Sequence, residues 1–257
     1  MKIGLFAGDS VGNRIAKFLG ERGEVPGCLV IDALDPRALN KEIVANASLS
    51  GSTPVFLSDS LGQPETLKRL RALELDLIIL AWWPYILNRD IIEIPRLGCL
   101  NFHPSLLPYN RGKHYNFWAI VESAPFGVTL HWVDVAVDCG DIAFQSPLEV
   151  SWEDTGGTLY HKAQEEIVRL FMDRFDEIKA GRIPRIPQDL TLGSSHRAHE
   201  LEPASRIELD KNYSARSLLN LLRARTFPPH PAVSFVEGDT RFEVRVEIRK
   251  VESGDEK

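Results

Sequence analysis

The sequence predicts an α/β protein with an open, mainly parallel sheet, followed by a small C-terminal segment of mixed α+β type. Over about the first hundred residues, short apolar runs alternate with amphipathic stretches, the pattern of strands joined by crossover helices. Apolar residues make up 44% of the 257 positions and charged residues 26%. These proportions exclude a disordered chain and leave enough apolar surface for a buried core.

The N-terminal strands are read from apolar runs that are too short for helices. The turn Gly8–Ser10 follows the first run and has the residue types of a helix N-cap. Apolar residues at helical spacing then run from Val11 to Leu19. The predicted strands are Ile3–Ala7, Cys28–Ile31, Pro54–Leu57, Asp76–Ala81 and Gly98–Phe102, with further helices over Pro36–Ala45 and Glu65–Leu73. This order predicts a Rossmann-like sheet.

The pattern changes after Pro108. Strands are predicted over Val128–Val133 and Ile142–Val150, and a long helix over Thr155–Lys179. The stretch Arg182–Pro187 resists helix formation and is interpreted as a linker. Beyond it, the sequence predicts a helix over Ser214–Arg225, a hairpin of Ala232–Val236 with Arg241–Ile248, and a frayed tail at Glu252–Lys257. We therefore expect a large domain over residues 1–185 and a small C-terminal segment over 186–257.

The net charge and the cysteine content argue against some classes of function for this protein. A net charge of −6 and a pI of about 5.7 disfavour a nucleic-acid-binding protein. The scattered cysteines Cys28, Cys99 and Cys139 indicate reduced thiols. We expect a cytoplasmic protein without a membrane partner, because there is no secretory signal and no apolar run near the roughly 20 residues of a membrane span. No convincing metal-ligand set is found, and His196 and His199 are interpreted as solvated.

The densest group of polar residues follows the predicted strand Gly98–Phe102. Asn101 and His103 are two positions apart, so on a strand they lie on one face while Phe102 points to the other. An amide donor beside an imidazole suits polarisation of a carbonyl group and transfer of a proton. Taken alone, such a pair is far more often a strand end whose amide and imidazole are satisfied within the fold than a catalytic pair.

A second group, Asp134–Asp141, forms a carboxylate-rich loop between two predicted strands. Aspartates of this kind commonly form turns. A carboxylate beside an imidazole raises the pKa of the histidine and orients its ring. The sequence alone does not bring Asp138 to His103.

Four ordered motifs resemble the formyltransferases that use N10-formyltetrahydrofolate. They are Leu100–Pro108, Gly127–Thr129, Val137–Ile142 and Glu153–Tyr160, within the span Asp76–Pro187. This family includes methionyl-tRNA formyltransferase, glycinamide ribonucleotide transformylase and the sugar N-formyltransferases. The resemblance implies the formyltransferase fold, N10-formyltetrahydrofolate as co-substrate, no metal, and Asn101, His103 and Asp138 as the catalytic residues.

The resemblance also implies a mechanism and a folate site. Asn101 and a protonated His103 would stabilise the developing oxyanion, and Asp138 would hold His103 cationic and help to relay the amine proton. His103 as general base remains an alternative. The residues expected to bind the folate are Trp83, Pro84, Tyr85, Ile86, Leu87, Val137 and Asp141. For the tryptophans Trp82 and Trp83, ordinary packing is an equal alternative.

The acceptor is expected to be a nucleotide-linked amino-dideoxysugar, with the amine at position 3 or 4 and a dTDP, UDP or GDP carrier. The segments 108–120 and 215–227 resemble the sugar N-formyltransferases, which serve surface polysaccharides such as O-antigen. The expected substrate-binding residues are Ser10, Ser105, Tyr109, Asn110, Arg111 and Lys113, whereas Arg223 and Arg225 are interpreted as surface or interface charges. A homodimer is expected by analogy. The alternatives are a methionyl-tRNA formyltransferase-like enzyme and a non-catalytic folate- or nucleotide-sugar-binding module.

Overall fold

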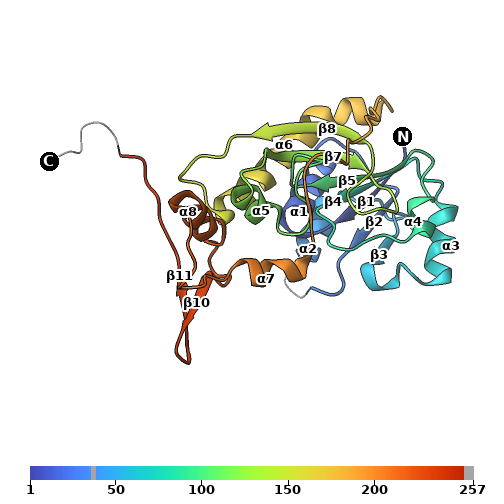
Figure 1. Ribbon diagram of the computed structural model, residues 1–257. Helices are drawn as coiled ribbons and strands as arrows, with labels where there is room; N and C mark the ends of the chain where they lie inside the picture. The colour runs from blue at the N-terminus through green and yellow to red at the C-terminus, as the bar shows by residue number, and fades with distance from the viewer. Residues whose placement is uncertain (36–38, 252–257) are drawn as a thin grey trace. The chain divides into compact units, whose positions relative to one another are not determined.

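A seven-stranded sheet with strand order β3-β2-β1-β4-β5-β7-β8 forms the centre of this computed structural model, which describes residues 1–35 and 39–251 (Figure 1). The pairs β1–β2, β1–β4, β2–β3 and β4–β5 are parallel, and β5–β7 is antiparallel. The strands are β1 (Ile3–Ala7), β2 (Cys28–Ile31), β3 (Val55–Leu57), β4 (Leu77–Ala81), β5 (Gly98–His103), β7 (Phe126–Trp132) and β8 (Ile142–Leu148). The predicted α/β class and mainly parallel sheet are confirmed.

The chain divides into two compact units. The first consists of Met1–His103, Thr129–Gln145 and Glu166–Gln188. The second consists of Pro104–Val128, Ser146–Glu165 and the chain from Asp189 onward. The stretch predicted as a linker is non-helical, but it pairs with β8 through reciprocal backbone hydrogen bonds between Ile142 and Ile186. It therefore belongs to the first unit up to Gln188.

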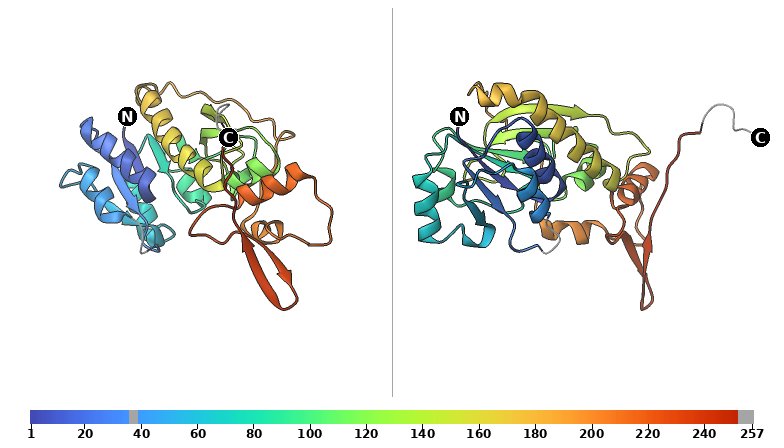
Figure 2. Two further views of the ribbon diagram at one scale, coloured as in Figure 1. Left: turned by 90° about the vertical axis from the view of Figure 1, so that its left-hand side faces the viewer. Right: turned by 180° about the vertical axis from the view of Figure 1, so that it is seen from behind.

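Helices cover both faces of the sheet in the first unit. On one face, α3 (Pro64–Ala72) and α4 (Arg89–Ile92) bury Leu70 and Ile91 in a core with Phe6 and Ile78. On the other face, α1 (Asp9–Glu21) and α6 (Gly156–Lys179) lie side by side (Figure 2), and Phe18 contacts Phe171 and Phe175. The short helix α2 (Asn40–Asn46) completes this unit. The start of the predicted helix, at residues 36–38, lies outside the described residues, as does the predicted frayed tail 252–257.

The start of α1 differs from the N-cap predicted for Gly8–Ser10. Gly8 occupies the N-cap position, and no side chain caps the helix. The Asp9 carboxylate instead accepts a hydrogen bond from the backbone N–H of Ser10. A Cβ at residue 8 would lie 2.7 Å from the carbonyl oxygen of Trp82, so this position requires glycine because β4 ends against it.

The second unit contains α5 (Tyr115–Val121), α7 (Leu201–Ala204), α8 (Ala215–Ala224), the strand pair β6 (Arg111–Gly112) and β9 (Ser195–His196), and the hairpin β10–β11 (Val233–Glu237 and Thr240–Val244). The helix and hairpin predicted after residue 214 are confirmed, although β11 ends earlier than predicted. The helices α4, α5 and α7 were not predicted. In α5 the reason is composition, because aromatic residues dominate this short segment and favour strands.

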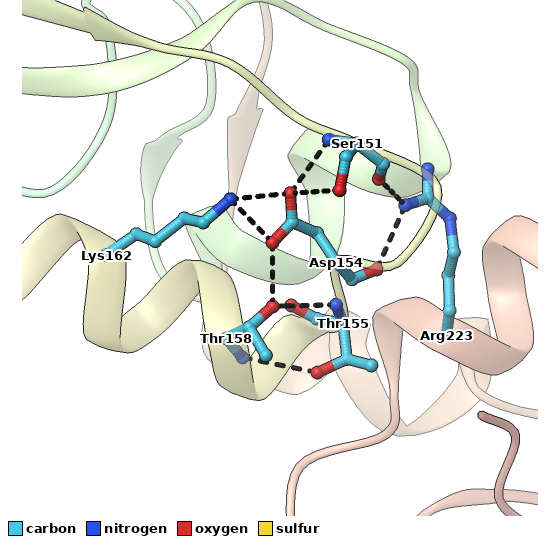
Figure 3. A network of polar contacts seen from close by, with 6 residues as sticks. All are labelled: Ser151, Asp154, Thr155, Thr158, Lys162 and Arg223. Carbon is cyan, nitrogen blue, oxygen red and sulfur yellow. Dashed lines mark hydrogen bonds and ion pairs between the residues drawn. The ribbon is translucent and has the colours of Figure 1, made fainter. Parts of the chain in front are cut away.

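Arg223 is buried in the second unit, so its interpretation as a surface charge is wrong. Its guanidinium donates to the carbonyl oxygens of Ser151 and Asp154, at 2.7 and 2.9 Å (Figure 3). The Asp154 carboxylate accepts hydrogen bonds from Ser151, Thr158 and Lys162. Arg225 is also largely covered, and its Nε donates to the hydroxyl of Ser205. The Arg223 bonds join α8 to the loop before α6, and the Arg225 bond joins the end of α8 to the end of α7.

Candidate active site

The predicted catalytic residues meet in the first unit. Strand alternation places Asn101 and His103 on one face of β5, and Phe102 packs against Phe171 on the other face, as predicted. The loop after β7 brings Asp138 to His103, with 3.4 Å between Asp138 Oδ1 and His103 Nδ1. His103 is 5% exposed, so this contact is shielded from water. The loop residue Asp138 has a φ of 54°, a left-handed conformation that aspartate tolerates better than most residues.

The structure adds His131, which the sequence analysis did not single out. It lies on β7 directly opposite Asn101. Its Nε2 is 3.1 Å from Asn101 Nδ2 and 3.6 Å from Asp138 Oδ1. Only the β5–β7 register brings these groups together, although the period-two alternation of Thr129 and His131 on one strand face could have drawn attention to it.

His131 is held as a neutral imidazole. Burial, and secondly the nearby charge of His103, lower its pKa to about 4, although Asp138 opposes the shift. Because the carbonyl oxygen of Trp132 can only accept, His131 Nδ1 carries the proton of this 2.9 Å bond. His131 Nε2 then accepts a hydrogen bond from Asn101 Nδ2, which leaves the second Nδ2 hydrogen of Asn101 for another acceptor.

His103, His131 and Asp138 are also the residues of the described chain that could hold a metal ion. One donor atom of each lies within 4.8 Å of the others. The same three side chains make the contacts with Asn101 and with one another that are described above, so these contacts account for the cluster without a metal ion.

The residues predicted to bind the folate have different environments within the first unit. Trp83 and Leu87 are part of the core, and Trp83 contacts Phe6 and Tyr85, so packing accounts for this tryptophan. The Tyr85 hydroxyl donates to Asp32. Pro84, Ile86 and Val137 are exposed, and Asp141 is half-buried. That these residues bind folate stays a prediction.

Most of the predicted substrate residues lie in the second unit, whereas Ser10 lies in the first. Ser105 is buried and donates to the carbonyl oxygen of Tyr109, while Lys113 is exposed. Arg111 is half-buried, and one of its terminal nitrogens is buried without a hydrogen-bond partner among the described residues.

Asn110 belongs to a second polar network that was not predicted. Its Nδ2 donates to Glu122, which also contacts Ser194 and His196. His196 lies between Glu122 and Glu200 and stacks on Trp118 with ring centroids 3.7 Å apart. The interpretation of His196 as solvated is therefore wrong, because contacts distant in sequence cover its ring; His199 is exposed.

Comparison with known protein families shows to which family the chain belongs. Residues 32–174 match the formyl transferase family, and residues 200–250 match the N-formyltransferase dimerization C-terminal domain. The methionyl-tRNA formyltransferase of Thermodesulfovibrio yellowstonii is 30% identical over 241 residues, covering 92% of this chain and 75% of the relative. This chain belongs to the formyl transferase family. It spans 53% of the length of another relative, the methionyl-tRNA formyltransferase of Methylacidiphilum infernorum, with 33% identity over 65% of this chain.

Solved structures extend the likeness over nearly the whole chain. A 4-N formyltransferase from Francisella tularensis superposes with a TM-score of 0.79 at 23% identity, covering 97% of this chain and 98% of that one. This likeness shows the formyltransferase fold. A formyltransferase from Anoxybacillus kamchatkensis, in complex with UDP-4,6-dideoxy-4-formamido-L-AltNAc and tetrahydrofolate, is 27% identical with a TM-score of 0.54, covering 79% of this chain and 89% of that one. Among residues 1–35 and 39–251, no helix has the length and apolar character to cross a membrane.

Proposed function

We propose that the chain transfers a formyl group from N10-formyltetrahydrofolate to the amine of a nucleotide-linked amino-dideoxysugar. The observation that carries the proposal is the buried contact of His103 with Asp138 beside Asn101. Family membership supports formyl transfer as the reaction. The 27% identical relative from Anoxybacillus kamchatkensis, bound to tetrahydrofolate and a formamido sugar nucleotide, supports the two substrates.

The first unit offers surfaces that suit a folate. A flat heterocycle binds between apolar side chains with a few polar groups to orient it. Ile86 is 78% exposed and Val137 51%, so both offer apolar surface for a ligand to cover. Trp83 and Leu87 anchor the segment that presents Pro84, Tyr85 and Ile86. Asp141 lies in the same loop as Val137. We propose these residues as the folate site.

In this proposal Asn101, His103 and Asp138 each have a separate role in the reaction. The folate supplies an activated formyl carbonyl. The remaining Nδ2 hydrogen of Asn101 and a protonated His103 stabilise the negative charge that develops on its oxygen when the amine attacks. As the new C–N bond forms and the bond to N10 breaks, the amine loses a proton and N10 gains one. Asp138 holds His103 cationic and relays this proton.

The second unit supports an anionic acceptor. One guanidinium nitrogen of Arg111 has no hydrogen-bond partner in the described part of the chain, and Lys113 is exposed, so both suit the phosphates of a nucleotide sugar. Ser105, Tyr109 and Asn110 neighbour them in sequence. Ser10 is proposed for the same substrate. A methionyl-tRNA formyltransferase-like enzyme is the second candidate, because the Thermodesulfovibrio yellowstonii relative covers 92% of this chain. We propose a cytoplasmic role in making a surface polysaccharide such as O-antigen in lipopolysaccharide.

The test is a mass-spectrometric turnover assay with N10-formyltetrahydrofolate and a panel of dTDP-, UDP- and GDP-linked amino sugars, beside methionyl-tRNA. We expect one formyl group on one sugar nucleotide. Replacement of His103 with Ala is expected to lower kcat by roughly a hundredfold to ten-thousandfold. Formylation of methionyl-tRNA instead would overturn the sugar proposal. Folate binding without turnover on any acceptor, unchanged in His103→Ala, would favour a binding module.

We also propose that the reaction needs no metal. Dialysis against EDTA is then expected to leave kcat unchanged. Added Zn²⁺ is expected to inhibit, because His103, His131 and Asp138 supply donors of the kind zinc prefers, and EDTA should reverse the inhibition. Loss of activity on EDTA treatment, restored by a divalent ion, would contradict this proposal.

A further inference from the structure

We infer that Gln188 is a positioning residue: its side-chain amide holds the loop Asp134–Asp141 so that Asp138 faces His103. The inference rests on the proposed function for its kinetic consequences. Gln188 lies after α6, far from Asp138 in sequence and outside the four motifs that indicate formyl transfer. Both residues belong to the first unit.

Gln188 donates both hydrogens of its side-chain amide to backbone carbonyl groups of this one loop. Gln188 Nε2 donates to the carbonyl oxygen of Asp138 at 3.0 Å and to that of Gly140 at 2.6 Å. The other end of the amide, Oε1, is buried and has no hydrogen-bond partner among the described residues. A flipped amide would set Oε1 against two carbonyl oxygens, so only the observed orientation is favourable. The two bonds span the residue after Asp138.

The loop needs such an external support. Asp138 has the left-handed φ of 54°, a backbone conformation that is disfavoured for residues other than glycine, although less so for aspartate than for most. The backbone bond within the loop, from Cys139 N–H to the Ala136 carbonyl, is 3.3 Å long. At Gly140 the loop presses on β7 so closely that a Cβ there would overlap the carbonyl oxygen of Trp132. Residues 134–137 are exposed, so packing does not hold this part of the loop.

The segment that carries Gln188 is itself fixed on the sheet. Ile186 and Ile142 exchange backbone hydrogen bonds of 2.8 and 3.0 Å. Trp132 Nε1 donates to the carbonyl oxygen of Pro184 at 2.7 Å, and the Arg185 guanidinium lies 3.8 Å from the centroid of the Trp132 ring. The backbone next to Gln188 is therefore held in place on the sheet, and the two hydrogen bonds of the Gln188 amide restrain the position of Asp138.

The first experiment is a double-mutant cycle. Gln188→Met keeps the length of the side chain and removes both donors, and we expect kcat to fall by roughly tenfold to a hundredfold, with the KM of the amine acceptor changed much less. In an Asp138→Asn background the same substitution should lower kcat by less than about twofold, because the carboxylate that Gln188 positions has already been removed. An equal loss in both backgrounds would overturn the inference and leave Gln188 a purely structural role. Gln164→Met removes a different glutamine, which is buried in α6, and should leave kcat unchanged.

A second variant, Gln188→Glu, tests the inference independently of whether Gln188→Met folds correctly. In Gln188→Glu the ionised carboxylate repels the two carbonyl oxygens, whereas the protonated acid donates one hydrogen bond. The kcat of this variant relative to wild type should therefore rise as pH falls toward about 5, while the ratio for Gln188→Met stays flat. A flat ratio for both variants would contradict the inference.

Hydrogen exchange tests the same idea without any substrate. In Gln188→Met, backbone amides of residues 134–141 should exchange faster, while those of β1 and β4 keep wild-type rates. Unchanged exchange in the loop would overturn the inference. If wild type formylates no acceptor, the proposed function fails, whereas this measurement still decides the role of Gln188.

Discussion

At the scale of single residues, the neutral imidazole of His131 is the feature with the clearest consequences. It accepts from Asn101 and donates to the backbone of its own strand, so it fixes the direction of the Asn101 amide. Such an orienting contact matters because an amide that stabilises an oxyanion must point at it before the reaction begins.

Replacement of His131 therefore tests the orientation of Asn101. We expect His131→Leu to lower kcat by roughly tenfold to a hundredfold, because the Asn101 amide loses its acceptor. His131→Gln retains an acceptor oxygen and should recover most of the activity. Steady-state kinetics with both substrates checks this, and an equal loss in the two variants would show that the acceptor has no role.

The pKa of His131 predicts how stability depends on pH. The folded-state pKa of about 4 lies below the usual 6.5, so between these values the unfolded chain binds more protons at this site. Stability from this residue is complete above about pH 6.5 and decreases toward pH 4, by roughly 3 kcal/mol in total. Urea unfolding across this range measures it. His131→Gln should lack this component, and parallel curves for the two proteins would contradict the prediction.

At the scale of elements, the start of α6 depends on Asp154 (Figure 3). Burial raises the pKa of this carboxyl, but hydrogen bonds from Lys162, Ser151 and Thr158 outweigh burial and hold it below its usual value. The ionised carboxylate is thus the form that joins the loop 151–155 to the helix. The contribution is present above about pH 4 and is lost as pH falls below it.

Removal of this carboxylate should destabilise the protein. We expect Asp154→Ala to lower the free energy of unfolding by about 2–4 kcal/mol, because the part-buried hydrogen bonds from Ser151 and Thr158 and the ion pair with Lys162 lose their acceptor. Asp173→Ala, at an exposed site on the same helix, is the matched control and should change it by less than about 0.5 kcal/mol. Urea unfolding at neutral pH compares the three proteins, and similar midpoints would refute the prediction.

At the scale of the whole molecule, the match of residues 200–250 to a dimerization domain supports a homodimer. The hairpin β10–β11 within it exposes Val236 and Phe242. Light scattering should give twice the chain mass of 28.9 kDa. Phe242→Arg should shift the protein toward monomer, while Val25→Arg, at another exposed apolar site, should not. A monomeric wild type would exclude this assembly.

The sequence by itself determined which segments form the strands of the sheet and its longer helices, their order along the chain, and the shared face of Asn101 and His103. These features follow from local periodicity, which every short window of sequence contains. Resemblance to a family then added Asp138. Tertiary structure alone brought His131 opposite Asn101, set Gln188 on the Asp138 loop, buried Arg223 and covered the ring of His196. These contacts join residues far apart in the chain, through strand register and packing, and no local pattern records them.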